Sequence, residues 1–202
     1  MELNKLLIKR QKDFIKKSVS FFNDCFYFPF SLLSCLIFTF RRFFFGPSNA
    51  LNYIKSVDSR SLLIILRCYG ARIGRNCDIQ QGLTFHNCKN FNNFTVGNNC
   101  HIGKNCFFDL RDTITIEDNV VISMCSKLIT HIDMSRSSLS SDFPASSGPI
   151  VIGNNSYLGV GSTVLMGVEI APKVLVAANS LVNKSIEKSC KVAGIPARVI
   201  GD

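Results

Sequence analysis

The fold of this protein is decided by residues 152–182, which read IGNNSYLGVGSTVLMGVEIAPKVLVAANSLV. Apolar residues recur there at every sixth position, as Ile152, Leu158, Val164, Ile170, Val176 and Val182. Neither the 3.6-residue period of an α-helix nor the alternation of an ordinary strand produces this spacing. A six-residue repeat is typical of a parallel β-helix, in which each repeat forms one short strand and one corner. The repeated apolar side chains are therefore predicted to point into the core.

The same period extends towards the N-terminus in three blocks, 73–91, 96–114 and 116–128, which are separated by slips. Gly and Asn occupy predicted corners such as Gly97-Asn98-Asn99, because both residues tolerate unusual backbone dihedral angles. The sequence thus predicts a mainly β solenoid over 73–202. Residues 131–149 do not repeat and are rich in Ser with two Pro, so they are predicted to form a loop extruded from the solenoid.

Residues 1–72 form a chemically different part, which is predicted to be a helical, basic and aromatic-rich extension. They carry 12 Lys or Arg against 4 Asp or Glu, and 11 of the 17 Phe. Residues 3–22 are predicted to form a basic amphipathic helix, and 49–69 a further helical segment. The uncharged run 25–40, closed by Arg41-Arg42, is shorter than the ~20 residues of a membrane-spanning helix and contains Pro29.

Two interpretations of residues 1–45 remain open. The extension is either an interfacial membrane anchor attracted to anionic lipid, or a helical cap that covers the first coil or a neighbouring subunit. Because the basic charge is confined to this part, a uniform basic surface for nucleic acid is not indicated.

The nine cysteines are interpreted as free thiols in a reducing compartment, and three of them as small core residues. Cys77, Cys100 and Cys106 each follow a repeat-starting apolar residue by four positions, a slot that small residues fill elsewhere. No secretory signal peptide is expected. The predicted location is therefore the cytoplasm. If residues 1–45 bind lipid, the predicted place of attachment is the inner face of the cytoplasmic membrane.

The hexad ladder, the loop that opens after Thr130-His131 and the ending VAGIPARVI at 192–200 together resemble the hexapeptide-repeat acetyltransferases. The resemblance covers about 73–201. It is closest to galactoside and maltose acetyltransferases and to O-acetyltransferases of bacterial surface polysaccharides. It implies a left-handed, three-sided β-helix with three hexads per coil. It also implies a homotrimer that binds acetyl-CoA in the groove between subunits, with a sugar hydroxyl or amine as acceptor.

His131 matches the position of the family's catalytic histidine. Imidazole titrates near working pH and can remove the proton of a sugar hydroxyl, so we expect His131 to be the general base. Asp133 and Asp109 are competing candidates for the carboxylate that orients this histidine. The activated hydroxyl would attack the thioester directly, so no covalent acyl-enzyme, and no role for Cys125 as a nucleophile, is required.

The resemblance also implies a set of residues for acetyl-CoA. Small residues on a flat face admit the pantetheine arm, and basic residues bind phosphate. The expected contacts are Tyr157, where relatives often carry Trp, Gly159, Ala177, Ala178, Asn183, where relatives usually carry Thr, Lys184 and Arg198. His86 and His101 do not have the spacing of a zinc site, so no metal is expected.

The predicted function is therefore acetyl-CoA-dependent O-acetylation of a sugar hydroxyl, on a bacterial surface polysaccharide or its precursor. Two alternatives remain open. One is N-acetylation of an amino sugar carried on a nucleotide. The other is a non-catalytic assembly scaffold, against which His131 and the intact ending argue.

Overall fold

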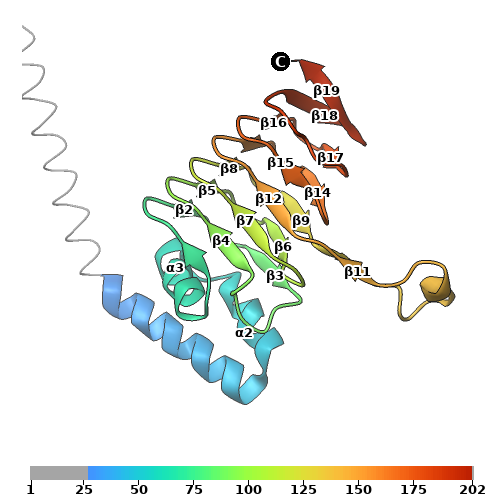
Figure 1. Cartoon of the computed structure of the whole chain (residues 1–202). Coiled ribbons are helices and arrows are strands. Elements are labelled where there is room, and N and C mark those ends of the chain that lie inside the picture. The colour runs from blue at the N-terminus through green and yellow to red at the C-terminus, as the bar shows by residue number, and fades with distance from the viewer. Residues whose placement is uncertain (1–26, 202) are drawn as a thin grey trace, which may run out of the picture.

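A computed structural model describes residues 27–201 as a three-sided parallel β-helix with helices at its N-terminal end (Figure 1). The predicted amphipathic helix at 3–22 lies outside the described residues. Successive strands occupy the three sides in turn, so one coil takes one strand from each of three sheets. The mainly β solenoid predicted from the hexads is confirmed.

Each side of the β-helix is a parallel sheet of very short strands. The first sheet contains β1 (Arg72–Ile73), β4 (Phe94–Val96), β7 (Ile114–Ile116), β12 (Ile150–Ile152) and β15 (Glu169–Ile170). The second contains β2 (Asp78–Ile79), β5 (His101–Ile102), β8 (Val121–Ile122), β13 (Tyr157–Leu158), β16 (Leu175–Val176), β18 (Lys191–Gly194) and the antiparallel β19 (Ala197–Gly201). The third contains β3 (Thr84–His86), β6 (Phe107–Asp109), β9 (Lys127–Ile129), β14 (Thr163–Leu165) and β17 (Leu181–Val182).

The hexad residues stack on their counterparts in neighbouring coils to form the core. On the second sheet, Ile102 pairs in register with Ile79 and Ile122, and all three side chains are fully buried. Near the N-terminal end the stack becomes aromatic, since Phe85 stacks on Phe108 with ring centroids 5.7 Å apart. Burial of apolar side chains on all three inner faces stabilises the solenoid.

The corners behave as the sequence predicts. Asn99 and Asn155 have φ values of 56° and 61°, in the left-handed region that Asn tolerates better than most residues. Asn side chains also link coils, because Asn99 accepts a hydrogen bond from Asn76 and donates one to Asn119, each at 3.2 Å. The cysteine interpretation holds for Cys100 and Cys106, which are fully buried, and burial raises the pKa of Cys106 to about 11.

The slips in the ladder all fall at one corner of the solenoid, where the chain passes from the third sheet to the first. We call this turn the insertion corner. In the fourth coil it is three residues long (166–168), but it is longer in the first three coils, at 87–93, 110–113 and 130–149. Ile152 and its register partner Ile170 are accordingly 18 residues apart, which is three hexads. In the earlier coils, register partners on this sheet are more than 18 residues apart.

The segment predicted as an extruded loop projects from the insertion corner of the third coil (Figure 1). It leaves and returns as a short antiparallel ribbon, in which β10 (His131–Ile132) pairs with β11 (Ser146–Ser147). A 3₁₀ turn, η1 (Ser138–Ser141), lies at its outer part. The ribbon was not expected from the Ser-rich sequence; it holds the base of the loop, and therefore His131, against the solenoid.

The helical part before β1 differs from the sequence prediction in two respects. The uncharged run was expected to be too short to span a membrane and to be interrupted by Pro29, but it belongs to a longer helix, Tyr27–Phe45, which includes Pro29 and both arginines. Arg41 and Arg42 lie over the rings of Tyr53 and Tyr69, so neither charge interrupts the helix. The second segment is two helices, α2 (Pro47–Ile54) and α3 (Ser59–Cys68), because Asp58 caps α3 by accepting hydrogen bonds from the main-chain N–H groups of Arg60 and Ser61.

Candidate active site

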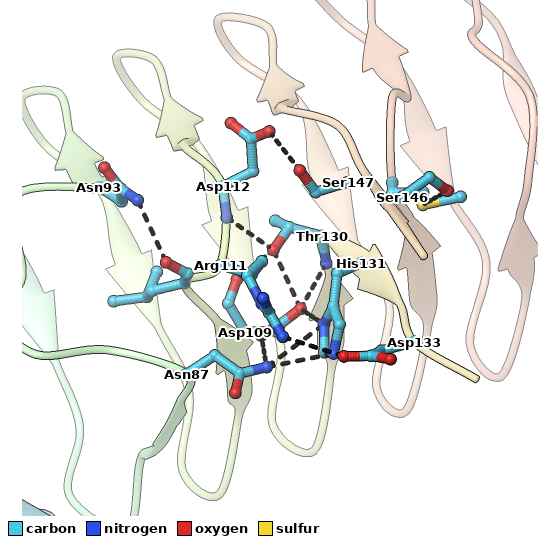
Figure 2. Close-up of polar contacts among 12 residues, drawn as sticks. Asn87, Asn93, Asp109, Arg111, Asp112, Thr130, His131, Asp133, Ser146 and Ser147 are labelled. Atoms are coloured by element: carbon cyan, nitrogen blue, oxygen red, sulfur yellow. Dashed lines mark hydrogen bonds and ion pairs between the residues drawn. The ribbon is translucent and has the colours of Figure 1, made fainter. Parts of the chain in front are cut away.

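Polar side chains from three successive coils meet at the insertion corner (Figure 2). Asn87 follows β3 in the first coil, Asp109 ends β6 in the second, and His131 follows β9 in the third. Adjacent members of this series are 22 residues apart in the chain. Parallel stacking of the coils therefore brings together residues that no local motif connects.

Asp109 is the carboxylate that contacts the predicted general base. Its Oδ2 lies 2.5 Å from Nδ1 of His131, and the Asp109 side chain is only 1% exposed. The same oxygen accepts a hydrogen bond from the main-chain N–H of Thr130 at 3.0 Å. A carboxylate at Nδ1 selects the tautomer with the proton on that nitrogen, which leaves the lone pair of the neutral ring on Nε2.

The surroundings of Asp109 keep it ionised despite its burial. Burial by itself raises the pKa of this carboxyl, but hydrogen bonds from His131, Asn87 and Thr130 and the charge of His131 outweigh it and lower the pKa below its usual range. Asn87 Nδ2 donates to Oδ1 at 3.0 Å, so both carboxylate oxygens have a partner. A negative charge is thus held in place to stabilise an imidazolium at His131.

Asn87 also contacts the imidazole ring. Its Nδ2 lies 3.4 Å from Nδ1 and 3.2 Å from Nε2 of His131. If Nδ2 of Asn87 lay on the axis of the Nε2 lone pair, it would be much farther from Nδ1 than from Nε2. The two distances are nearly equal, so the amide lies beside the ring and off that axis. Nε2 therefore keeps a free direction in which to accept a proton. The His131 side chain is 19% exposed, which leaves it accessible from the surface.

Asp133, the other candidate carboxylate, makes different contacts. It pairs with Arg111 at 3.3 Å and accepts a hydrogen bond from the main-chain N–H of Ser135 at 2.9 Å. Hydrogen bonds from Ser135 lower its pKa, with smaller contributions from the charges of Arg111 and His131. Figure 2 shows Arg111 extending past the Asp109–His131 pair to reach Asp133. Of the two candidate carboxylates, it is therefore Asp109 that contacts the His131 ring directly.

A small pocket of about 190 Å³ opens at this site. It is lined by Arg111, His131 and Asp133 and by the returning strand of the loop, 145–147. The extruded loop thus supplies both the histidine and one wall of the pocket, so a small molecule in the pocket would lie next to the imidazole ring.

Three of the predicted cofactor residues share a second pocket, of about 640 Å³, at the C-terminal end of the solenoid. Asn183, Lys184 and Arg198 all line it, together with Lys188. The main-chain oxygen of Ala197 accepts a hydrogen bond from the Arg198 guanidinium at 2.8 Å. Basic side chains that converge on one pocket are suited to bind phosphate groups.

The other predicted cofactor residues lie on the second side and its corner. Tyr157 is 41% exposed and its hydroxyl accepts a hydrogen bond from Ser123 at 2.9 Å. A Cβ added to Gly159 would lie 2.5 Å from the main-chain N of Ala178, so the glycine is required for stacking of the coils whether or not a ligand binds. Ala177 is half-buried and Ala178 is exposed.

The remaining histidines have ordinary surroundings. His101 pairs with Asp78 at 2.9 Å on the surface of the second side. The His86 ring lies beside Phe107 and 6.3 Å, centroid to centroid, from that of His131. Across residues 27–201, no group of three or more His, Cys, Asp or Glu side chains is arranged to hold a metal ion.

The sequence interpretation missed Asn87, Thr130 and Arg111. Each lies at the insertion corner, just after a strand of the third sheet. The signal that could have identified them is the set of interruptions in the six-residue period. At each interruption, polar residues follow the last inward-facing apolar residue. That signal becomes useful only once all slips are known to fall on the same edge.

The chain is similar in sequence to known hexapeptide-repeat proteins. A model of the hexapeptide repeat of succinyl-transferase matches residues 94–125 and 149–184. Galactoside O-acetyltransferase of Escherichia coli K12 is 34% identical over 133 residues, which cover 64% of this chain and 63% of that protein. The chain thus matches less than two thirds of the length of this relative.

Solved structures agree with the sequence matches. A maltose O-acetyltransferase from Clostridium difficile 630 superposes with a TM-score of 0.65 at 24% identity, covering 75% of this chain and 81% of that one. A galactoside acetyltransferase in complex with coenzyme A superposes with a TM-score of 0.64 at 23% identity, covering 86% and 81%. A hexapeptide-repeat acetyltransferase from Vibrio cholerae is 27% identical, with a TM-score of 0.63 and coverage of 73% and 82%. The fold is the left-handed β-helix of the hexapeptide-repeat acetyltransferases, and the chain is similar to the galactoside and maltose enzymes among them.

Proposed function

We propose that this protein is an acetyl-CoA-dependent O-acetyltransferase that acts on a sugar hydroxyl of a bacterial surface polysaccharide or its precursor. The observation that carries the proposal is the contact between His131 and the buried carboxylate of Asp109, at the mouth of a pocket formed by the extruded loop. The names of the relatives support the reaction class, since they include galactoside and maltose O-acetyltransferases.

The geometry supports a direct transfer. Nε2 of His131 accepts the proton of the acceptor hydroxyl as its oxygen attacks the thioester carbonyl of acetyl-CoA. The tetrahedral intermediate collapses, the C–S bond breaks, and the imidazolium returns its proton to the departing thiolate. Asp109 does not take up the proton; its negative charge stabilises the imidazolium and holds the ring in place.

Acetyl-CoA is the proposed donor, and the related galactoside acetyltransferase was solved in complex with coenzyme A. Lys184 and Arg198, which share the C-terminal pocket, are the proposed phosphate contacts. Tyr157 and the small residues Gly159, Ala177 and Ala178 would line the path of the pantetheine arm. We also propose a homotrimer, in which the donor lies between the catalytic corner of one subunit and the neighbouring subunit.

Release of coenzyme A, followed with a thiol reagent, tests the proposal. The full-length protein is expected to release coenzyme A from acetyl-CoA faster when sugar acceptors are present. Mass spectrometry of the products should show one added acetyl group, stable to hydroxylamine if it is on nitrogen and removed if it is on oxygen. Absence of acceptor-dependent release across neutral, acidic and amino sugars would refute the activity.

We further propose that the protein is cytoplasmic and attaches to the inner face of the cytoplasmic membrane. The helix Tyr27–Phe45 supports this proposal. One side packs on the rest of the chain, through the buried Phe38 and its edge contact with Tyr69, as a cap does. The rest of its surface exposes large apolar residues, namely Phe28, Phe30, Leu32, Leu33, Leu36, Phe40, Phe43, Phe44 and Phe45. The helix is long and apolar enough to span a bilayer, but its packed side favours a position in the interface.

Vesicle sedimentation tests this location. The full chain is expected to sediment with vesicles that contain anionic lipid, because apolar burial and the basic N-terminal part both favour binding. Replacing Phe43, Phe44 and Phe45 by Ser should weaken sedimentation strongly, since these side chains are 80%, 63% and 64% exposed and contribute little to the core. Sedimentation that is equal for the wild type and the triple variant would contradict the proposed anchor.

A further inference from the structure

A third pocket lies directly beside the catalytic corner and has no part in the reaction described above. Its volume is about 600 Å³, and it is formed between α2 and the first coil, around β3. Its lining contains polar residues from both elements, among them Ser48, Asn52, Thr84, His86 and Asn87. We call it the α2 pocket.

The α2 pocket and the small pocket at His131 adjoin. Arg111 lines both of them. Asn87, which lines the α2 pocket, contacts the His131 ring at 3.2 Å. A molecule whose hydroxyl reaches Nε2 of His131 can therefore extend its remaining atoms into the α2 pocket.

The charge of the α2 pocket is positive. Lys55, Lys89 and Arg111 line it, and its lining contains no Asp or Glu. Lys55 and Lys89 are exposed, and neither makes an ion pair with any residue in 27–201. Only Arg111 is partly neutralised, by Asp133. Two ammonium groups that face one cavity and have no ion-pair partner within residues 27–201 attract an anion.

We propose that the α2 pocket binds an anionic group of the acceptor, a carboxylate or a phosphate, so that the acceptor is an acidic or phosphorylated sugar rather than a neutral one. This inference rests on the proposed function and narrows its acceptor class. Hydroxyl and amide groups in the pocket can bind the sugar ring, while the two lysines bind the charge. The carboxylate of a uronic acid and the phosphate of a sugar phosphate share this chemistry.

The donor is the other anion to consider, because coenzyme A carries phosphates. Its proposed phosphate contacts, Lys184 and Arg198, line a pocket beside β18 and β19, whereas the α2 pocket lies between α2 and β3. Figure 1 shows these two groups of elements at opposite ends of the solenoid. The two assignments make opposite predictions for kinetics. Loss of charge in the α2 pocket should raise KM for the acceptor and leave KM for acetyl-CoA unchanged.

The kinetic test uses matched acceptors and a matched control. Transfer from acetyl-CoA is measured to a nitrophenyl glucoside and the corresponding glucuronide, and to glucose and glucose 1-phosphate. The double variant Lys55→Gln/Lys89→Gln is compared with Lys104→Gln, which removes the same kind of charge from an exposed corner outside the described pockets. The double variant is expected to raise KM about tenfold for the anionic acceptors only. Added salt should raise the same KM in the wild type.

A binding measurement separates this inference from the proposed function. Calorimetry of the full chain with glucuronate, glucose 1-phosphate or inorganic pyrophosphate requires no turnover. The α2 pocket is supported, even if no acetyl transfer is found, when the double variant weakens binding of a probe and Lys104→Gln does not. Preference for one probe identifies the source of the anion. The inference is overturned if none of the three probes binds. It is also overturned if the double variant raises KM equally for neutral and anionic acceptors, or changes only KM for acetyl-CoA.

Discussion

Replacement of His131 by alanine is expected to lower kcat for acetyl transfer by about 10²–10⁴-fold, the usual contribution of a positioned general base. Without Nε2 the acceptor hydroxyl must lose its proton to water, so attack on the thioester becomes slow. KM for acetyl-CoA should change little, because the proposed donor contacts Tyr157, Lys184 and Arg198 are untouched. Steady-state kinetics with both substrates varied in turn will separate these two effects.

His101→Ala is the matched control for this variant. His101 pairs with Asp78 on the second side of the solenoid and does not contact the insertion corner. It should retain wild-type kcat, which shows that loss of an imidazole from the solenoid is not itself damaging. Turnover at the wild-type rate in His131→Ala, with the fold intact by circular dichroism, would remove His131 from the mechanism.

Replacement of Asp109 by asparagine is expected to lower kcat by about 10²–10⁴-fold while leaving KM for acetyl-CoA near its wild-type value. An amide in place of the carboxylate can present its NH₂ group to the ring, which favours the wrong tautomer, and it no longer stabilises the imidazolium. The matched control is Asp133→Asn, which removes an equal charge nearby from a carboxylate that contacts Arg111 and Ser135 rather than the His131 ring. Equal losses in the two variants would contradict the assignment of the orienting role to Asp109.

The same substitution has a signature in stability. The folded state lowers the pKa of Asp109, so the ionised carboxylate stabilises the protein at pH values above the ordinary pKa of aspartate, about 4. That contribution is lost as the pH falls through the lower folded pKa. Asp109→Asn should therefore reduce the free energy of unfolding at neutral pH, by about 1–3 kcal/mol, and the difference from the wild type should shrink in acid. Urea unfolding at several pH values measures both quantities.

Much of the fold was predictable because the six-residue period is a local property. An inward apolar residue, a small or polar corner and the next inward residue all fall within one repeat, so residues 152–182 specify their own geometry. Asn99 and Asn155 likewise mark left-handed corners by their residue type alone. The N-terminal helix was less predictable, because Arg41 and Arg42, which close the uncharged run, lie inside the helix and over Tyr53 and Tyr69, which are distant in sequence.

The site followed different rules. The sequence determined the solenoid and the extruded loop, since the six-residue period and its interruption are contiguous patterns, and the family resemblance indicated His131 as the candidate base. Only the tertiary structure decided between the carboxylates: Asp133 is two residues from His131 yet pairs with Arg111, while Asp109, a full coil away, makes the contact. The physical reason is the stacking of coils. It places every inserted segment on one edge, so neighbours at that edge are about one coil apart in the chain, and proximity in sequence no longer indicates proximity in space.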